Sequence, residues 1–354
     1  MKRTTLIILS IILLPIIGFG QGVNGTTFYG LNSGTGSPKS AFFGESAGKN
    51  STAQLNTFIG YYAGEMNTSQ EANTFVGSRS GNINKGQYNT FVGWDSGELN
   101  KGSYNAFFGG RSGNGNLGDC NVFLGNQTGM GNKGAYNLFS GFQSGFVNGA
   151  GSNNTFYGAR SGYYNLTGNS NLYLGSYAGF NNSAGSFNVF IGNYAGSSEM
   201  GNNKLYIENS SATTPLIYGK FDTDQVGINT TNIPNGFAFA VKGKVIAEEV
   251  NIAIQGSSTI WPDYVFNDEY NLPSLKEVEK HIKEKGYLQN IPPVAEVLEN
   301  GLFLGDMNAK LLQKIEELTL YAIQQQKELE LQKEKNISLE SRLLKLEFIN
   351  LNKN

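Results

Sequence analysis

Residues 40–196 repeat one nine-residue pattern, in which polar and apolar positions alternate before two glycines. Each copy reads Asn-x-Phe-x-Gly-x-x-small-Gly, with Ser40 replacing Asn in the first copy and Tyr173 replacing Phe in the ninth. Ten copies follow one another at offsets of 16 or 17 residues, and a degenerate copy precedes them at Phe28–Gly34. A fixed period of this length predicts a solenoid in which each repeat forms one coil.

The third position of each copy is the aromatic centre of a short predicted strand, because Asn-Thr-Phe-Ile-Gly reads as a strand that ends at a breaker. A strand of four or five residues is not stable alone, but stacked copies can pair at a spacing of about 4.8 Å. We therefore predict a mainly β fold, a β-roll or β-solenoid of about ten coils, with a ladder of buried rings. The ladder consists of Phe42, Phe58, Phe75, Phe91, Phe107, Phe123, Phe139, Phe156, Tyr173 and Phe190.

The fifth and ninth positions are glycine in every copy, and the eighth is always Ala, Ser or Thr. Glycine adopts positive φ without steric cost, and a small neighbour avoids a clash between stacked corners, so this stretch predicts a tight turn. The repeated Asn predicts a side-chain ladder or a turn cap. The corner glycines at the fifth position are Gly44, Gly60, Gly77, Gly93, Gly109, Gly125, Gly141, Gly158, Gly175 and Gly192.

The second and fourth positions, such as Val122 and Leu124, are also mostly apolar. In a strand they point away from the Phe side, so both faces of the sheet are expected to be buried. The solenoid interior can cover only one of them. We expect another copy of the chain to cover the other.

The first twenty residues have the pattern of a secretory signal peptide. Lys2 and Arg3 precede an apolar run over 6–17, and the small residues Gly18 and Gly20 follow it. The run is shorter than the roughly 20 residues of a membrane-spanning helix, so no span is expected after its removal. We expect an exported protein, in the extracellular space or on the cell surface of a Gram-negative bacterium.

Charge and composition limit the kinds of function to expect. The net charge is −2 with only 15% charged residues, and the sequence has no basic stripe that would indicate nucleic-acid binding. The single cysteine, Cys120, excludes an intrachain disulfide, and we expect it to be a small buried residue. The single histidine, His281, has no second His or Cys near it in sequence, so we expect a surface residue and no metal or other cofactor.

The repeat pattern stops before the C-terminal third of the chain, where other elements are expected. Short strands are expected in a connector over 201–260, which follows the array over 21–200. A small helical module is expected over 261–306, where Ser274 and Glu277 form a capping box and Gly286 ends the helix, with a second helix over 294–299. From Met307 to about Asn350 apolar residues follow the 4-3 spacing of a coiled coil, which is assigned to 307–354. Its core is Leu311, Ile315, Leu318, Ala322, Leu329, Leu339, Leu343 and Leu346, interrupted by Gln325, Gln332 and Asn336.

Two resemblances follow from these motifs. Residues 25–200, with strands that end in apolar-Gly-x-x-Ser/Ala, resemble the head of trimeric autotransporter adhesins, which is a β-roll of three chains. The motifs WPDYVF, LPSLKEVE and LLQKIEELTLY in 261–330 resemble the C-terminal module of tail-fibre-like secreted bacterial proteins. More loosely, they resemble the intramolecular chaperone domains of phage tail spikes and endosialidases. Those domains trimerise, help a β-fibre to assemble, and in many cases cleave themselves with a Ser/Lys dyad.

These resemblances imply an exported homotrimeric fibre, adhesin-like, whose C-terminal module drives trimerisation and folding, with a surface glycan or protein as receptor. The alternative is a self-cleaving protein in which Ser257 or Ser258 acts with Lys276. In the array, the seventh position varies from coil to coil, as solvated positions do, and predicts no enzyme. Exposed aromatics could stack on sugars, although isolated surface aromatics usually have no role. They are Tyr61, Trp94, Tyr177 and Tyr194.

Overall fold

A computed structural model describes residues 20–21, 25–34, 36–68, 70–252 and 261–351 of the chain. It divides into two compact units, one ending at Val245 and one beginning at Ile246, and each is described by itself. The predicted signal peptide lies almost entirely outside the described residues. Among the described residues, no helix combines the length and the apolar character needed to cross a membrane.

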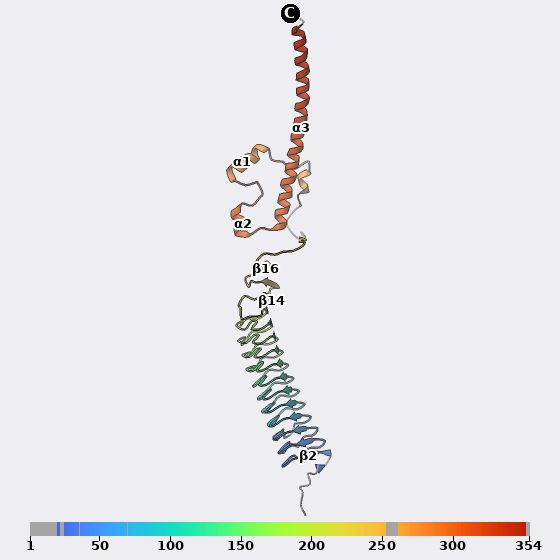
Figure 1. Ribbon diagram of the computed structural model, residues 1–354, viewed down its shortest axis with the longest axis vertical. Helices are drawn as coiled ribbons and strands as arrows, with labels where there is room; N and C mark the ends of the chain where they lie inside the picture. Colours follow the sequence, from blue (N-terminus) through green and yellow to red (C-terminus); the bar gives the residue numbers. More distant parts are fainter. Residues whose placement is uncertain (1–19, 22–24, 35, 69, 253–260, 352–354) are drawn as a thin grey trace, which may run out of the picture. The chain divides into compact units, whose positions relative to one another are not determined.

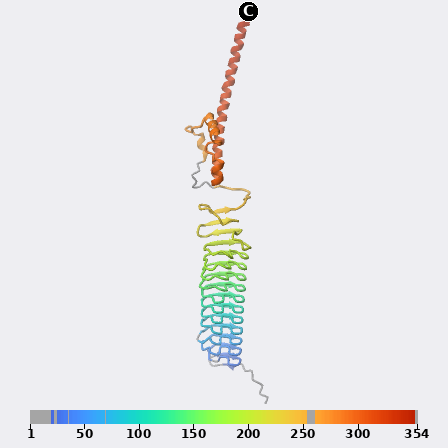
Figure 2. The same ribbon diagram turned by 90° about the vertical axis from the view of Figure 1, so that its left-hand side faces the viewer.

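The first unit is a column of stacked coils (Figures 1 and 2), which confirms the predicted β-solenoid. Each coil contributes one three-residue strand, shorter than the four or five residues expected, and each strand pairs in parallel and in register with the next. The degenerate copy at Phe28–Gly34 forms a strand of the same stack. The strands are β2 (Thr27–Tyr29), β3 (Ala41–Phe43), β4 (Thr57–Ile59), β5 (Thr74–Val76), β6 (Thr90–Val92), β7 (Ala106–Phe108), β8 (Val122–Leu124), β9 (Leu138–Ser140), β10 (Thr155–Tyr157), β11 (Leu172–Leu174) and β12 (Val189–Ile191).

Both ends of the stack carry antiparallel strands. At one end, β1 (Gly20–Gln21) pairs with β2. At the other, β13 (Lys204–Ile207) still pairs in parallel with β12, so the stack continues beyond Gly196, where the sequence pattern stops. β14 (Ile217–Lys220) and β15 (Gln225–Ile228) then turn antiparallel, and β16 (Phe239–Val241) pairs with β15. Such strands cover an edge that would otherwise accept a foreign strand. The short strands expected in the connector over 201–260 correspond to β13–β16.

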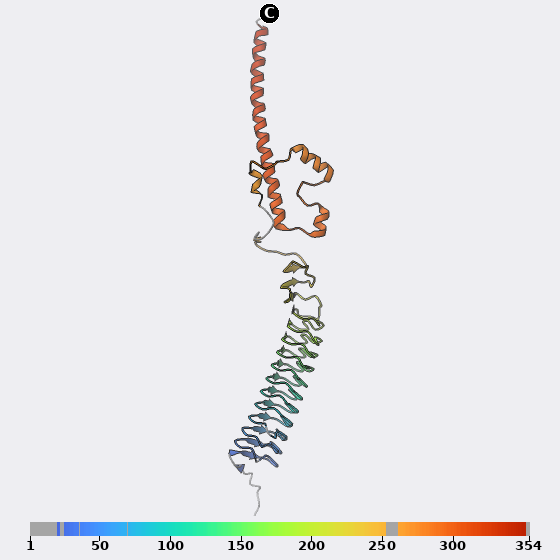
Figure 3. The same ribbon diagram turned by 180° about the vertical axis from the view of Figure 1, so that it is seen from behind.

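The second unit is helical (Figure 3). It contains a 3-10 helix η2 (Pro262–Phe266), α1 (Leu275–Lys285), α2 (Val294–Asn300) and α3 (Leu304–Leu351). Ser274 forms the predicted capping box with Glu277, and α1 ends at Gly286 with a left-handed φ of 81°. The 48 residues of α3 correspond to a length of about 72 Å.

Only the first part of α3 packs against the rest of the helical unit. Its Ala309 and the Val265 side chain of η2 are both buried. The Tyr270 hydroxyl donates to the Glu317 carboxylate at 2.7 Å, and the Tyr321 hydroxyl donates to the carbonyl of Pro273. The segment that leads into α1 is therefore held against one side of α3.

Candidate functional site

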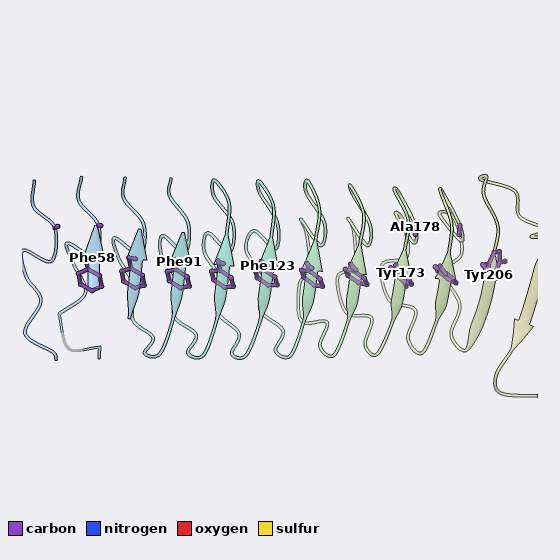
Figure 4. Close-up of a cluster of buried hydrophobic side chains, with 14 of the residues drawn as sticks. Phe58, Phe91, Phe123, Tyr173, Ala178 and Tyr206 are labelled. Carbon is purple, nitrogen blue, oxygen red and sulfur yellow. The ribbon is translucent and has the colours of Figure 1, made fainter. Parts of the chain in front are cut away.

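The aromatic ladder fills the solenoid interior (Figure 4). All ten predicted rings are fully buried. From Phe58 to Phe190 the rings of neighbouring coils lie 4.7–5.0 Å apart with planes within 7° of parallel. Burial raises the pKa of the Tyr173 phenol, so its hydroxyl stays neutral. Each ring thus packs against the rings of the coils before and after it. Because the ring of every coil points inward, the direction of the other side chains of that coil is set as well.

The corner glycines are required by both conformation and space. All ten fifth-position glycines have φ between 117° and 141°. A Cβ on Gly93 would lie 2.5 Å from the carbonyl oxygen of Gly109 in the next coil. The ninth-position Gly97 has φ 61°, and a Cβ there would overlap the ring of Phe91. The corners therefore stack backbone against backbone, as the small residues predicted.

The same corner contains a left-handed residue that the sequence analysis missed. The seventh position is not glycine, yet Arg79, Asp95 and Arg111 have φ of 55°, 49° and 55°. Hydrogen bonds to the previous coil hold this conformation, as in the 2.8 Å bond from the Arg79 amide to the carbonyl of Tyr61. The residue types carry little signal for it, because Arg rarely adopts positive φ. These side chains form a ridge along the solenoid.

A second left-handed position precedes the repeated Asn. Tyr88, Tyr104 and Cys120 occupy it, with φ of 58°, 61° and 57°. The expectation that Cys120 is buried is wrong: its side chain is half-buried, because this position lies on an outer bend rather than in the interior. Tyr88 and Tyr104 stack with centroids 5.0 Å apart.

Asparagine side chains form two ladders beside the rings. In the first, the backbone N–H of Asn73 donates to the side-chain oxygen of Asn56 at 2.9 Å, so the repeated Asn forms the expected ladder. The second was missed, although its members recur at the same period in the sequence. In it, the Asn116 side chain donates to Asn100 at 2.8 Å and accepts from Asn132 at 2.7 Å. Both ladders satisfy polar groups that the narrow coil cannot expose to water, but the second is interrupted between Asn165 and Asn182, whose side-chain oxygen and nitrogen, respectively, have no partner among the described residues.

The second and fourth strand positions form the outer strand face, defined here as those positions in β3–β12. None of them is charged, and most are apolar. In the single chain these side chains are half-buried or exposed, for example Leu124 at 38% and Leu174 at 43%. An apolar surface that continues over ten strands exceeds the scattered apolar residues of an ordinary protein surface and indicates an interaction site.

The predicted coiled-coil residues form a second uncovered surface. Leu311, Ile315, Leu318, Ala322, Leu329, Leu339, Leu343 and Leu346 are all exposed on α3. The polar residues Gln325, Gln332 and Asn336 in the same register are exposed too. The opposite side of the first turns carries the buried Gln313 and Glu317, which bind Tyr270. Among the described residues, the heptad side of α3 is therefore uncovered except near Leu318, which borders a cavity beside α1.

Of the candidate cleavage residues, only Lys276 lies within the described part of the chain. Lys276 is exposed in the first turn of α1. Ser257 and Ser258 lie outside the described residues. His281 is half-buried, which corrects the expectation of a surface residue: its ring lies 5.8 Å from that of Tyr287, because the segment after α1 folds back over the helix. With Ile282, Leu318 and others, His281 lines a cavity of about 90 Å³. Across the described residues no group of His, Cys, Asp and Glu is arranged to hold a metal ion.

A small charge network lies on the seventh-position ridge. Arg79 forms ion pairs with Glu98 and, at 3.5 Å, with Asp95. Burial, and then the nearby Glu98 charge, raise the pKa of the Asp95 carboxyl despite the opposing effect of Arg79. The Arg111 guanidinium lies 5.6 Å from the Trp94 ring centroid. The two acidic groups and two arginines largely neutralise one another, which disfavours an anion or cation site here.

Further along the same ridge, side chains of three successive coils form what we name the aromatic patch. It consists of Phe146, Arg160, Tyr163, Tyr164, Tyr177 and Phe180. Of the aromatics singled out in the sequence, the structure places Tyr177 in this patch and stacks Tyr194 on it at 4.6 Å. The sequence analysis missed the other members, because it considered the aromatics one by one and not as neighbours in successive coils.

Comparisons with protein-family models, with curated proteins and with solved structures gave no match to this chain. The surfaces described above are thus the basis for any functional assignment.

Proposed function

We propose that this protein is an exported homotrimeric fibre with an adhesin-like structural role, and that its C-terminal unit drives trimerisation and folding. The observation that carries the proposal is the outer strand face, which is apolar, uncharged and uncovered in the single chain over β3–β12. The uncovered heptad side of α3 supports it independently.

The best partner for the outer strand face is another copy of the same face. Its side chains repeat once per coil, and the distance between neighbouring coils is close to the 4.8 Å that separates the ring centroids of Phe107 and Phe123. A second stack of the same coils has the same repeat, so its side chains interdigitate along the whole length. A partner with any other repeat would match at only a few coils. The resemblance to trimeric adhesin heads favours three copies over two.

The helix α3 would set the alignment of the copies. Apolar heptad positions favour association, and polar residues such as Gln325 and Gln332 at core positions disfavour shifted registers. Alignment matters because the coils of the solenoid are nearly identical. Two outer strand faces alone could therefore associate with a shift of one coil and lose little binding free energy.

Sedimentation of the purified mature chain, residues 21–354, tests this proposal. We expect a trimer, and we expect Leu172→Glu together with Leu174→Glu to weaken it, because two charges would enter an apolar interface. Tyr136→Glu is the matched control, since Tyr136 is an exposed aromatic outside the outer strand face. A monomeric wild-type chain at micromolar concentration would refute the proposal. The intact mass of the same sample detects the self-cleavage alternative, because a cut near Ser257 removes roughly a quarter of the chain.

A further inference from the structure

The aromatic patch is the most distinctive surface of the solenoid that the proposed assembly does not use. It lies on the turns after the strands, at positions seven, ten and eleven of the repeat, and not on the outer strand face. Two coils before Phe146 and Tyr163, the tenth position carries Asn114 and Met130 instead of aromatics. Neighbouring coils are hydrogen-bonded beneath the patch, as in the 3.1 Å bond from the Tyr164 amide to the carbonyl of Phe180. The patch is thus a rigid platform with a local composition of its own.

Within the patch, Tyr164 lies differently from its neighbours. Tyr163 stacks with Phe146 at 5.1 Å and with Phe180 at 5.2 Å, in adjacent coils on either side, so both of its faces are covered. The Tyr164 ring is inclined at 71° to Tyr163 and 80° to Phe180, at centroid distances of 4.6 and 5.3 Å. Neither of these contacts stacks a parallel ring on Tyr164, and 43% of the residue is exposed.

The hydrogen-bonding groups around Tyr164 are almost all neutral. Arg160 donates to the Tyr177 hydroxyl at 2.9 Å and to Gln143 at 3.0 Å, and its guanidinium lies 5.6 Å from the Tyr177 ring centroid. The cation is thus held by aromatic and amide groups. Residues 121–198 contain no Asp or Glu, and Lys133 and Arg160 are their only charged residues. The surface offers apolar ring faces, amides and hydroxyls, with little charge.

We propose that the aromatic patch binds a neutral glycan, with one sugar ring stacked on the outward face of Tyr164. This inference rests on the proposed adhesin-like function and names its receptor class. The apolar face of a sugar ring suits an open tyrosine face, and its hydroxyls suit neutral amides and phenols. The coil spacing is also close to the spacing of sugar rings along an extended β-linked glycan, so adjacent coils can contact adjacent sugars. A nucleic acid would need several phosphate-neutralising cations, and the patch has one.

Tyr88 provides a matched comparison. It is exposed to the same degree as Tyr164, at 44%, but it lies outside the aromatic patch, where it stacks on Tyr104 with planes 8° from parallel. Its hydroxyl donates to the Glu71 carboxylate at 3.5 Å, whereas Tyr164 lies in a stretch without Asp or Glu. The two tyrosines thus offer similar exposed area in different surroundings, and a neutral glycan that binds the aromatic patch should distinguish them.

The test is titration of the purified mature chain with cellohexaose and chitohexaose, followed by an array of neutral glycans. We expect saturable binding that Tyr164→Ala weakens about tenfold or more, while Tyr164→Phe retains it and Tyr88→Ala leaves it unchanged. Binding of no neutral glycan, a preference for sulfated or sialylated glycans, or equal losses in the Tyr164→Ala and Tyr88→Ala variants would overturn the inference.

Sedimentation of the same samples separates this inference from the fibre proposal. If Tyr164→Ala dissociates the assembly, the patch is a contact between chains, and the glycan inference fails. If the wild-type chain is a trimer without glycan affinity, only the glycan inference fails. If it is a monomer that binds the glycans through Tyr164, the trimeric fibre is wrong and the glycan site stands.

Discussion

The rings of Phe107 and Phe123 stack 4.8 Å apart with planes 4° from parallel, and both are fully buried. Each ring packs between two others, so removing one opens a gap that the hydrogen-bonded coils on either side cannot close. We expect Phe123→Ala to cost about 3–5 kcal/mol of unfolding free energy, measured by denaturant titration. Thr90→Ala, on the outer strand face, should cost much less. Equal and small losses in the two variants would contradict the inward assignment of the ladder.

Substitution of the ninth-position glycine, which lies against the ring, is also expected to destabilise the fold. Gly97→Ala places a methyl group against Phe91 and a side chain at φ 61°, so both overpacking and backbone strain destabilise the coil. We expect a loss of about 2 kcal/mol or more in a thermal melt. Gly36→Ala is the control, because the nearest atom to its added Cβ is 3.9 Å away and its φ is not positive. It should change stability by less than about 0.5 kcal/mol.

The array could be predicted because ten copies of one pattern reinforce each other, whereas features that depend on three-dimensional neighbours could not. The left-handed φ of Arg79 and Tyr88 is imposed by the hydrogen bonds that their backbone N–H groups donate to carbonyls of the preceding coil, against the preference of the residue type. Tyr206 extends the stack without the glycine motif, because pairing with Phe190 is sufficient. His281 is half-buried because the segment that follows α1 folds back over it. In the same way, the aromatic patch exists only when successive coils are superposed.

The interior asparagine ladder provides a third prediction. Asn116→Ala removes an acceptor for Asn132 and a donor to Asn100, which leaves an unpaired amide oxygen on Asn100 in the interior. We expect a loss of about 1–3 kcal/mol, together with faster amide hydrogen exchange in the neighbouring coils. The exposed Asn126 serves as the control, since Asn126→Ala removes an amide that water already solvates. Unchanged exchange in the Asn116→Ala variant would show that the ladder does not stabilise the stack.

The helical unit should respond to alkaline pH through Tyr270. Burial, and then the hydrogen bond to Glu317, raise the pKa of Tyr270 to about 12 from its usual value of 10.0. The folded chain therefore holds this proton more tightly than the unfolded chain, so the contribution is complete below pH 10 and is lost as the pH rises toward 12. Absorbance at a wavelength specific for tyrosinate, compared between wild type and Tyr270→Phe, measures this titration. A group that ionises near pH 10 would show that the contact of Tyr270 with α3 does not persist in solution.

The last prediction concerns assembly. A chain that stacks its coils alone exposes the outer strand face, and a growing stack also has an open strand edge that can accept a wrong partner. Because the coils are nearly identical, the faces of two chains can associate in many registers, and the polar core positions of α3 are the feature that would penalise all but one. We expect the fragment 261–354 to sediment as a trimer, and Leu339→Glu to dissociate it. We also expect a chain truncated before Trp261 to aggregate on refolding. A monomeric fragment, or a truncated chain that refolds unaided to a clean trimer, would mean that the outer strand faces align themselves and that the C-terminal unit has another role.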